Sequence, residues 1–356
     1  MKTFSCTCGN RLFFESTTCL RCKKTLGFDP ESLQLLPLNS EKHGLWIPDQ
    51  LTVFEEIQFR RCKNTLDYQV CNWLIPENNQ HTYCIACRMN EKIPSLTKGE
   101  NHDLWASMEV SKHRLLYTLL SLGLPVIPKS DDPKKGLAFA FLEDKRTNQD
   151  VKHEHVLTGH AAGLITVNLN EADNAFREAT RKEFAESYRT LLGHFRHESG
   201  HYYWDILIKG SSNIEAFRAL FGDERKNYKL ALKHYHSNPV DMDENRAYIS
   251  NYAQAHPFED WAETWAHYLH MVDTLETAIS FGLLEDNDEK MDFHQMMTEW
   301  VDLSIMMNSL NRSMGLYDAY PFILTDKVKE KIGFVHRILL HVPSTTQFWA
   351  SQERHP

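Results

Sequence analysis

Apolar and polar residues recur with two different periods along the chain, and the change of period divides it into a mixed first part and a helical second part. Residues 104–122 repeat apolar side chains every three or four positions, the spacing of one helix face. Residues 137–142 and 164–169 instead alternate in the manner of strands. The pattern therefore predicts a helix and two strands ahead of residue 173.

The helical period continues from residue 173 almost to the end of the chain. We expect helices over residues 173–190, within 184–208, and over 213–235, 257–281, 287–310 and 326–340. Between the last two, a loop is predicted by the polar residues Asn311, Arg312, Ser313 and Asp318. Strands followed mainly by helices indicate an α+β fold with a small sheet.

The composition is that of an ordinary globular protein. Of 356 residues, 42% are hydrophobic and 24% are charged, and no apolar run approaches the roughly 20 residues of a membrane span. The first residues, MKTFSCTC, lack the apolar core of a secretory signal, so we expect a cytoplasmic protein without membrane association. The net charge of −9 and the lack of a basic stripe make nucleic acid an unfavoured partner.

All eight cysteines fall within the first 87 residues, and their spacing is typical of metal binding. The 19/22 and 84/87 pairs have the Cys-x2-Cys spacing of zinc knuckles, whereas the 6/8 pair is shorter and the 62/71 pair longer. Four thiolates make a closed tetrahedral zinc site, so we predict two structural zinc ions, although the pairing stays open. The preferred grouping is sequential: Cys6, Cys8, Cys19 and Cys22 in one set, and Cys62, Cys71, Cys84 and Cys87 in the other.

Disulfides are the alternative use of eight cysteines. Residues 88–356 contain no cysteine, and thiolates bound to metal in a reducing compartment explain that distribution better. Basic residues near the cysteines offset the charge of a four-thiolate site or bind a partner; they are Lys23, Lys24, Arg60, Arg61 and Lys63. We expect this cysteine-rich region, a zinc ribbon, to dock a protein partner or the substrate, with a purely structural role as the alternative.

A polar stretch over residues 88–100, which contains Pro94 and Gly99, is the best domain boundary. We therefore expect a zinc-ribbon domain over residues 1–90 and a second, mostly helical domain over residues 100–356.

The second domain contains the motif His-Glu-Ser-Gly-His at residues 197–201. On a helix, His197 and His201 are i,i+4 neighbours on one face and can hold one zinc ion. Glu198 lies beside them, where a carboxylate can take a proton from a water molecule at the metal. Gly200 is a poor helix former, which we interpret as room for a close neighbour.

A pair of carboxylates downstream completes the predicted metal site. Pro257 suits the first turn of a helix, which places Glu259 and Glu263 one turn apart on the same face. We expect Glu259 to be the third ligand and Glu263 to bond a ligand histidine, with His197 as the preferred partner. A solvated helix face is the alternative, but the aromatic neighbours of this pair indicate burial. Competing ligands are His256, His267 and His270, of which His267 continues the same face.

HExxH followed by ExxxE resembles the gluzincin metallopeptidases, and the Glu-x-x-Ala-Glu helix is similar to that of the anthrax lethal factor type of site. That resemblance implies a role for Tyr252, which stands seven residues before Glu259, in stabilising the oxyanion or protonating the leaving amine. Glu259 follows His201 by 58 positions, which exceeds the compact gluzincin spacing. An inserted helical hairpin would account for the difference.

Almost the whole chain also resembles a bacterial family of zinc-binding metallopeptidases with an N-terminal zinc ribbon. The similarity rests on FSCTCGN, CLRC and LGFDP near the N-terminus, on residues 191–198 and 200–205, on Glu259 to His267, and on residues 308–315 (NSLNRSMG). It implies an N-terminal ribbon with two four-cysteine sites followed by a zincin-like domain.

Together these features predict one catalytic and two structural zinc ions, and hydrolysis of a peptide or isopeptide bond with Glu198 as general base. The alternative function is a non-catalytic adaptor that keeps zinc for stability. By analogy with zincins, residues 163–169 either pair with an extended substrate or form a core strand. We interpret Tyr202, Tyr203 and Trp204 mainly as core residues.

Overall fold

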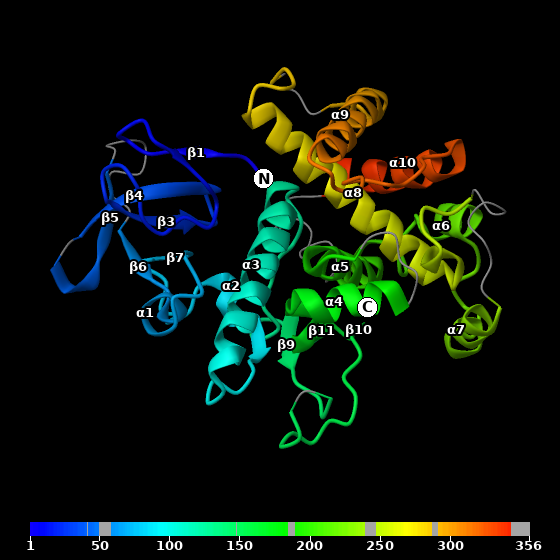
Figure 1. Ribbon diagram of the computed structural model, residues 1–356, viewed down its shortest axis with the longest axis horizontal. Helices are drawn as coiled ribbons and strands as arrows, with labels where there is room; N and C mark the ends of the chain where they lie inside the picture. Colours follow the sequence, from blue (N-terminus) through cyan, green and yellow to red (C-terminus); the bar gives the residue numbers. More distant parts are fainter. Residues whose placement is uncertain are drawn as a thin grey trace. The chain divides into compact units, whose positions relative to one another are not determined.

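The computed structural model describes residues 1–40, 42–49, 58–146, 148–183, 189–238, 247–286 and 291–342 (Figure 1). Contacts along the chain divide it into two compact units, the first formed by residues 1–158 and 163–173 and the second by residues 159–162 and 174–343. Short strands dominate the first 92 residues, and helices dominate the second unit. The expected α+β fold, with a zinc ribbon ahead of a mostly helical domain, is confirmed.

The cysteine-rich part of the first unit is built on short antiparallel strands. A hairpin of β1 (Phe4–Ser5) and β2 (Arg11–Leu12) precedes a five-stranded sheet. The sheet has the order β3 (Thr25–Asp29), β4 (Gln34–Ser40), β5 (Trp46–Pro48), β6 (Phe59–Arg61) and β7 (Leu74–Pro76). Short helices lie between or after these strands: η1 (Lys42–Gly44), α1 (Lys63–Asp67) and α2 (Ile85–Arg88).

The rest of the first unit contains the long helix and the two strands that the sequence predicts. Helix α3 (Gly99–Ser121) extends the predicted range by five residues at its start. Strand β9 (Ala138–Leu142) pairs in parallel with β8 (Asn90–Lys92) and β11 (Leu164–Asn168), and η2 (Leu169–Ala172) follows. Ile165 and Val167 of β11 are fully buried, so this strand serves the core. Its use as a substrate strand stays a prediction.

In the described ranges, the second unit consists of helices and loops apart from the short strand β10 (Gly159–Ala161). Its helices are α4 (Asn174–Glu183), α5 (Leu191–Leu207), α6 (Ile214–Phe221), α7 (Tyr228–Ser237), η3 (Tyr252–Gln254), α8 (Pro257–Ser280), α9 (Phe293–Ser313) and α10 (Asp326–Leu340). None of the helices in the described ranges combines the length and apolar character needed to cross a membrane.

Two predictions for these helices were wrong. The range 213–235 is two helices, because Gly222 ends α6 with a φ of 97°, a left-handed conformation that favours glycine. Asn311, Arg312 and Ser313 belong to α9 and not to a loop, since the helix continues to Ser313. Residues 184–188 and 287–290, predicted as helix, lie outside the described ranges.

Helices α5 and α8 form the centre of the second unit and pack closely against each other (Figure 1). A Cβ atom at Gly200 would lie 2.9 Å from Ala262 Cα, so glycine is what permits this approach. Two indole nitrogens of α8 reinforce the crossing: Trp261 Nε1 donates to the Gly200 carbonyl at 2.8 Å, and Trp265 Nε1 donates to Ser199 Oγ at 3.0 Å. The expected close neighbour of Gly200 is therefore the backbone of α8.

Candidate metal centres and catalytic site

The histidines of α5 and the carboxylates of α8 meet where these two helices pack. Thr190 caps α5, accepting a hydrogen bond from Gly193 N at 3.0 Å. His256 caps α8 in the same way through Nδ1, which accepts from Phe258 N at 3.1 Å, and Pro257 occupies the first turn. Each helix thus begins with a side chain that satisfies one of its free backbone N–H groups, within two turns of the residues that carry the chemistry.

The donor atoms of His197, His201 and Glu259 converge in this region. All three lie within 4.8 Å of one another, with Glu259 buried. Glu259 Oε2 is 3.0 Å from His197 Nε2 and 3.5 Å from His201 Nε2. Tetrahedral zinc with bonds of 2.0–2.1 Å to nitrogen and oxygen places neighbouring ligand atoms about 3.4 Å apart. The donor set therefore fits a zinc ion, with a fourth position left for a small ligand.

Glu263 contacts the ring nitrogen of His197 that does not face the other donor atoms. Its Oε1 lies 2.6 Å from His197 Nδ1, so that Nε2 of the same ring faces Glu259. Burial raises the pKa of Glu263, but the hydrogen bond and the charge of His197, together with smaller effects of His267 and Ser250, lower the pKa overall. For His197, burial lowers the pKa while the bonds to Glu259 and Glu263 raise it well above its usual value. This is the arrangement that the sequence proposed for the carboxylate pair.

Glu198 is buried next to the two histidines. Burial raises the pKa of its carboxyl, and the positive charges of His197 and His201 oppose that effect. Within the described ranges its Oε2 has no hydrogen-bond partner. A buried carboxylate oxygen without a partner costs about 1–3 kcal/mol, so its retention indicates a partner such as a water molecule or a substrate.

Two tyrosines flank the donor set. Tyr252, in η3, lies with its ring 5.9 Å from that of His197, and burial raises the pKa of its hydroxyl. Tyr228 donates a hydrogen bond of 2.5 Å to Glu259 Oε1, the oxygen that does not face the histidines. Tyr228 could not be predicted from the sequence, because a tyrosine 31 residues from Glu259 has no periodic relation to it.

The three competing histidines have other contacts. His267 Nδ1 lies 2.8 Å from the Tyr320 hydroxyl, and His256 caps α8. His270 Nδ1 is bonded by Arg196, which also pairs with Asp273. None of the three joins His197, His201 and Glu259 in the metal-compatible groups found in the described part of the chain.

The eight cysteines are free thiols that lie in the two sequential sets of four. In the first set, Sγ atoms are 3.5 Å apart for Cys6 and Cys22 and 3.6 Å apart for Cys8 and Cys19. In the second, the Cys71 and Cys84 Sγ atoms are 3.7 Å apart. Zinc–sulfur bonds of 2.3 Å place tetrahedral sulfurs about 3.8 Å apart. Both sets therefore have the size of a four-thiolate zinc site.

Charged and polar groups lie beside both cysteine sets, and at Cys19 they favour the thiolate. Backbone hydrogen bonds from Cys22 and Arg21 outweigh burial and lower the pKa of Cys19 to about 6. Beside the second set, Lys112 is buried and pairs with Glu109 at 2.7 Å. Burial lowers the pKa of Lys112, but the charges of Glu109 and Cys87 raise it above its usual value. The sequence pointed to other basic residues and did not single out Lys112.

An N-terminal ribbon with two four-cysteine sets, joined to a helical domain with an HExxH helix, defines the class of this protein as a ribbon-bearing zinc protein. Residues 101–338 match the family described as "Putative zinc-binding metallo-peptidase", and residues 3–98 match a zinc-ribbon domain. The chain belongs to this zinc-binding metallopeptidase family, as its sequence resemblance implied.

Similar proteins occur in mycobacteria. One from Mycobacterium bovis and one from Mycobacterium tuberculosis, both described as uncharacterized, are each 38% identical to this chain over 349 residues. The aligned region covers 95% of either chain in each case, so the similarity includes the ribbon and the helical domain together. No solved structure shows a significant match.

Proposed function

We propose that this protein is a zinc-dependent hydrolase of amide bonds in peptides or protein conjugates. The observation that carries the proposal is the Glu198 carboxyl. It is buried beside the converging donors of His197, His201 and Glu259, and its Oε2 has no partner among the described residues. A metal site kept only for stability has no use for such a carboxylate.

His197, His201 and Glu259 would hold the catalytic zinc, with Glu263 fixing the ring of His197. A zinc ion in this position would polarise an amide carbonyl and acidify a water molecule. Membership of a zinc-binding metallopeptidase family supports this assignment at the level of the reaction class.

The protein's own groups would move the protons. Glu198 accepts a proton from the attacking water and then delivers it to the leaving amine, which is the role of a general base followed by a general acid. Tyr252 keeps its hydroxyl proton, since burial raises its pKa, and donates a hydrogen bond to the oxygen on which charge develops.

The ribbon would bind two further zinc ions, for a total of three per chain, and recruit a protein partner or the substrate. The fully buried thiols of Cys62, Cys71, Cys84 and Cys87 suit a permanent structural ion. Eight reduced cysteines also favour a cytoplasmic location. Elemental analysis of the purified chain tests the count: three zinc ions agree with the proposal, and fewer than two contradict it.

The decisive experiment compares wild type with Glu198→Gln on a proteome-derived peptide library, with cleaved termini identified by mass spectrometry. Glu198→Gln should retain its zinc content and lose cleavage, while Glu285→Gln, at an exposed position, should behave as wild type. Equal cleavage by wild type and Glu198→Gln would exclude Glu198 as the base. No cleavage by either would favour the alternative, a zinc-stabilised adaptor.

A further inference from the structure

Lys331 is a buried cation that joins α10 to two other parts of the second unit and takes no part in the proposed reaction. Its side chain lies on α10 and the residue is 3% exposed. Nζ donates to Asp260 Oδ2 at 2.6 Å and to the Ala247 carbonyl at 2.7 Å. Because removing an ammonium group from water is costly, a lysine in such a place requires these partners.

Aromatic rings complete the surroundings of this ammonium group. Nζ lies over the ring of Tyr248, 4.3 Å from its centroid, and over that of Phe221 at 5.6 Å. The face of an aromatic ring attracts a cation at such distances. Two oxygen acceptors and two rings therefore meet at one nitrogen atom, which fixes α6, α8 and the chain at residues 247–248 against one another.

The chain that Lys331 holds leads directly to the candidate catalytic tyrosine. The anchored segment, residues 247–251, runs into η3, whose first residue is Tyr252. Within the segment, the Ser250 side chain contacts Glu263, the carboxylate that orients a metal-binding histidine. The segment is thus attached to the helix of the metal ligands at two places.

Both partners of Lys331 are adjacent to groups of the catalytic site. Asp260 directly follows Glu259, the carboxylate of the donor set. The ring of Tyr252 lies 5.9 Å from that of His197. One ammonium group therefore bonds the helix turn that supplies a metal ligand and the segment that supplies Tyr252, and so sets the distance between them.

We propose that Lys331 is a positioning residue that holds the Tyr252 hydroxyl in place relative to the donor set. The proposal rests on the proposed hydrolase function and adds a residue that acts through Tyr252 without touching the reacting atoms. When the ammonium group is removed, the Ala247 carbonyl loses its donor and the anchored segment is held less firmly. Misplacing a group that acts in the transition state lowers kcat more than it weakens substrate binding.

Lys331→Met in the full-length zinc-loaded protein tests this role, because methionine keeps much of the aliphatic stem and removes the charge. For a peptide that the wild type cleaves in the library experiment, kcat should fall at least tenfold while KM changes less than twofold. Adding Tyr252→Phe to Lys331→Met should lower kcat by less than a further twofold, since both changes act through one hydroxyl. Losses that multiply in the double variant would overturn the proposal.

A second variant guards against unfolding, because Lys331→Met leaves the buried Asp260 carboxylate without its cation. Lys331→Met combined with Asp260→Asn removes both charges and should show the same loss of kcat with a thermal unfolding midpoint near that of wild type. The Ala247 carbonyl still lacks its donor in this variant. Wild-type kcat in the charge-free variant would exclude positioning by Lys331.

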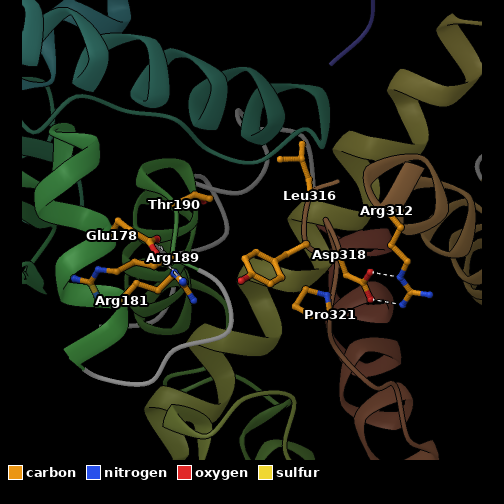
Figure 2. A pocket seen from close by; sticks show the side chains of 9 residues that line it. Glu178, Arg181, Arg189, Thr190, Arg312, Leu316, Asp318 and Pro321 are labelled. Atoms are coloured by element: carbon orange, nitrogen blue, oxygen red, sulfur yellow. Dashed lines mark hydrogen bonds and ion pairs between the residues drawn. The ribbon is translucent and has the colours of Figure 1, made fainter. Parts of the chain in front are cut away.

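The matched control removes a cation that fixes a different segment against α8. Arg312 binds both oxygens of Asp318 at 2.6 and 2.7 Å on the wall of a pocket (Figure 2). This segment reaches α8 through the Tyr320 hydroxyl, 2.8 Å from His267 Nδ1, and supplies none of the metal-compatible groups in the described ranges. Arg312→Met should keep the wild-type kcat. An equal loss in Arg312→Met and Lys331→Met would show a general structural effect and contradict the proposal.

A binding measurement separates failure of the positioning role from failure of the hydrolase assignment. The probe is acetohydroxamic acid, a small chelating ligand of zinc whose bound oxygen can accept a hydrogen bond from Tyr252. By isothermal titration calorimetry, Lys331→Met and Tyr252→Phe should each weaken its binding at least threefold, and the double variant should bind no more weakly than the weaker single variant. If the wild type hydrolyses nothing but shows this coupling, the positioning role stands and the reaction is wrong. Equal affinities for wild type and Lys331→Met would overturn the role.

Discussion

His197 Nδ1 and Glu263 Oε1 lie 2.6 Å apart, so a carboxylate of α8 holds from behind the same ring whose Nε2 faces Glu259. This contact fixes which nitrogen of the imidazole is available to a metal. It also sets the angle at which His197 meets His201 and Glu259, because the ring is held on both sides.

Replacing Glu263 by glutamine should weaken zinc binding at this centre by 10- to 100-fold, since the shape is kept and the charge that orients His197 is lost. Competition with a chelator measures the dissociation constant of the most weakly bound zinc ion, which we expect to be the one at this centre. Glu276→Gln is the control, because Glu276 lies on α8 more than three turns from Glu263. An unchanged dissociation constant for Glu263→Gln would show that the contact is incidental.

Tyr228→Phe should weaken the binding of the same zinc ion by roughly tenfold. The hydroxyl donates to Glu259 Oε1, and its loss leaves an oxygen of a buried carboxylate without that donor, at a cost of about 1–3 kcal/mol. X-ray absorption at the zinc edge should also show whether Glu259 turns its second oxygen to the metal. Tyr317→Phe, which removes an exposed hydroxyl, is the control. The prediction fails if both variants bind zinc as wild type does.

Gly200→Ala should destabilise the second unit by about 1–3 kcal/mol and weaken zinc binding, because the added Cβ would lie 2.9 Å from Ala262 Cα. Separating α5 from α8 moves both histidines away from Glu259. Thermal unfolding and chelator competition measure the two effects. Gly99→Ala, where a Cβ meets nothing within 4 Å, should be neutral or slightly stabilising. Equal behaviour of the two alanine variants would argue against close packing at Gly200.

Features that depend on local spacing could be predicted from the sequence. The i,i+4 pairs His197/His201 and Glu259/Glu263 each lie on one helix face, so their helical periods sufficed to propose the donor set and the supporting bond. The Cys-x2-Cys spacing likewise pointed to the two cysteine sets, which the structure groups sequentially. Each of these pairs is local, whereas joining the two helices into one site was inferred from the chemistry of a zinc ion held by two histidines and one glutamate.

Features that depend on chain reversal could not be predicted. Tyr228 reaches Glu259 only because the chain turns at Gly222 and starts a new helix at residue 228, whereas the apolar period suggested one continuous helix. Most of the described strands in the ribbon have only two or three residues, too few for a period of two to be recognised. The contact between Asn308 and Tyr320 was missed for a similar reason, because these residues meet only after the chain folds back at the end of α9.

The turn that starts α7 should make stability depend on pH. Arg218 binds both oxygens of Glu224 at 2.6 and 3.0 Å, and this bond outweighs burial and lowers the pKa of Glu224. A carboxyl whose pKa is lower in the folded chain than in the unfolded chain binds more protons when unfolded. Its contribution is therefore present above the usual glutamate range, near pH 4.5, and is lost as the pH falls through the lower folded value.

Glu224→Gln keeps the shape of the side chain but not its charge, so it should lower the free energy of unfolding by about 1–2 kcal/mol at pH 7. The difference from wild type should shrink as the pH is lowered below 4.5, because the wild-type carboxyl then takes up a proton. Denaturant unfolding at several pH values measures this difference in the free energy of unfolding. Glu215→Gln is the control, because Glu215 contacts Arg218 through one exposed ion pair. A difference that stays constant from pH 7 to pH 4 would show that the charge of Glu224 does not stabilise the turn into α7.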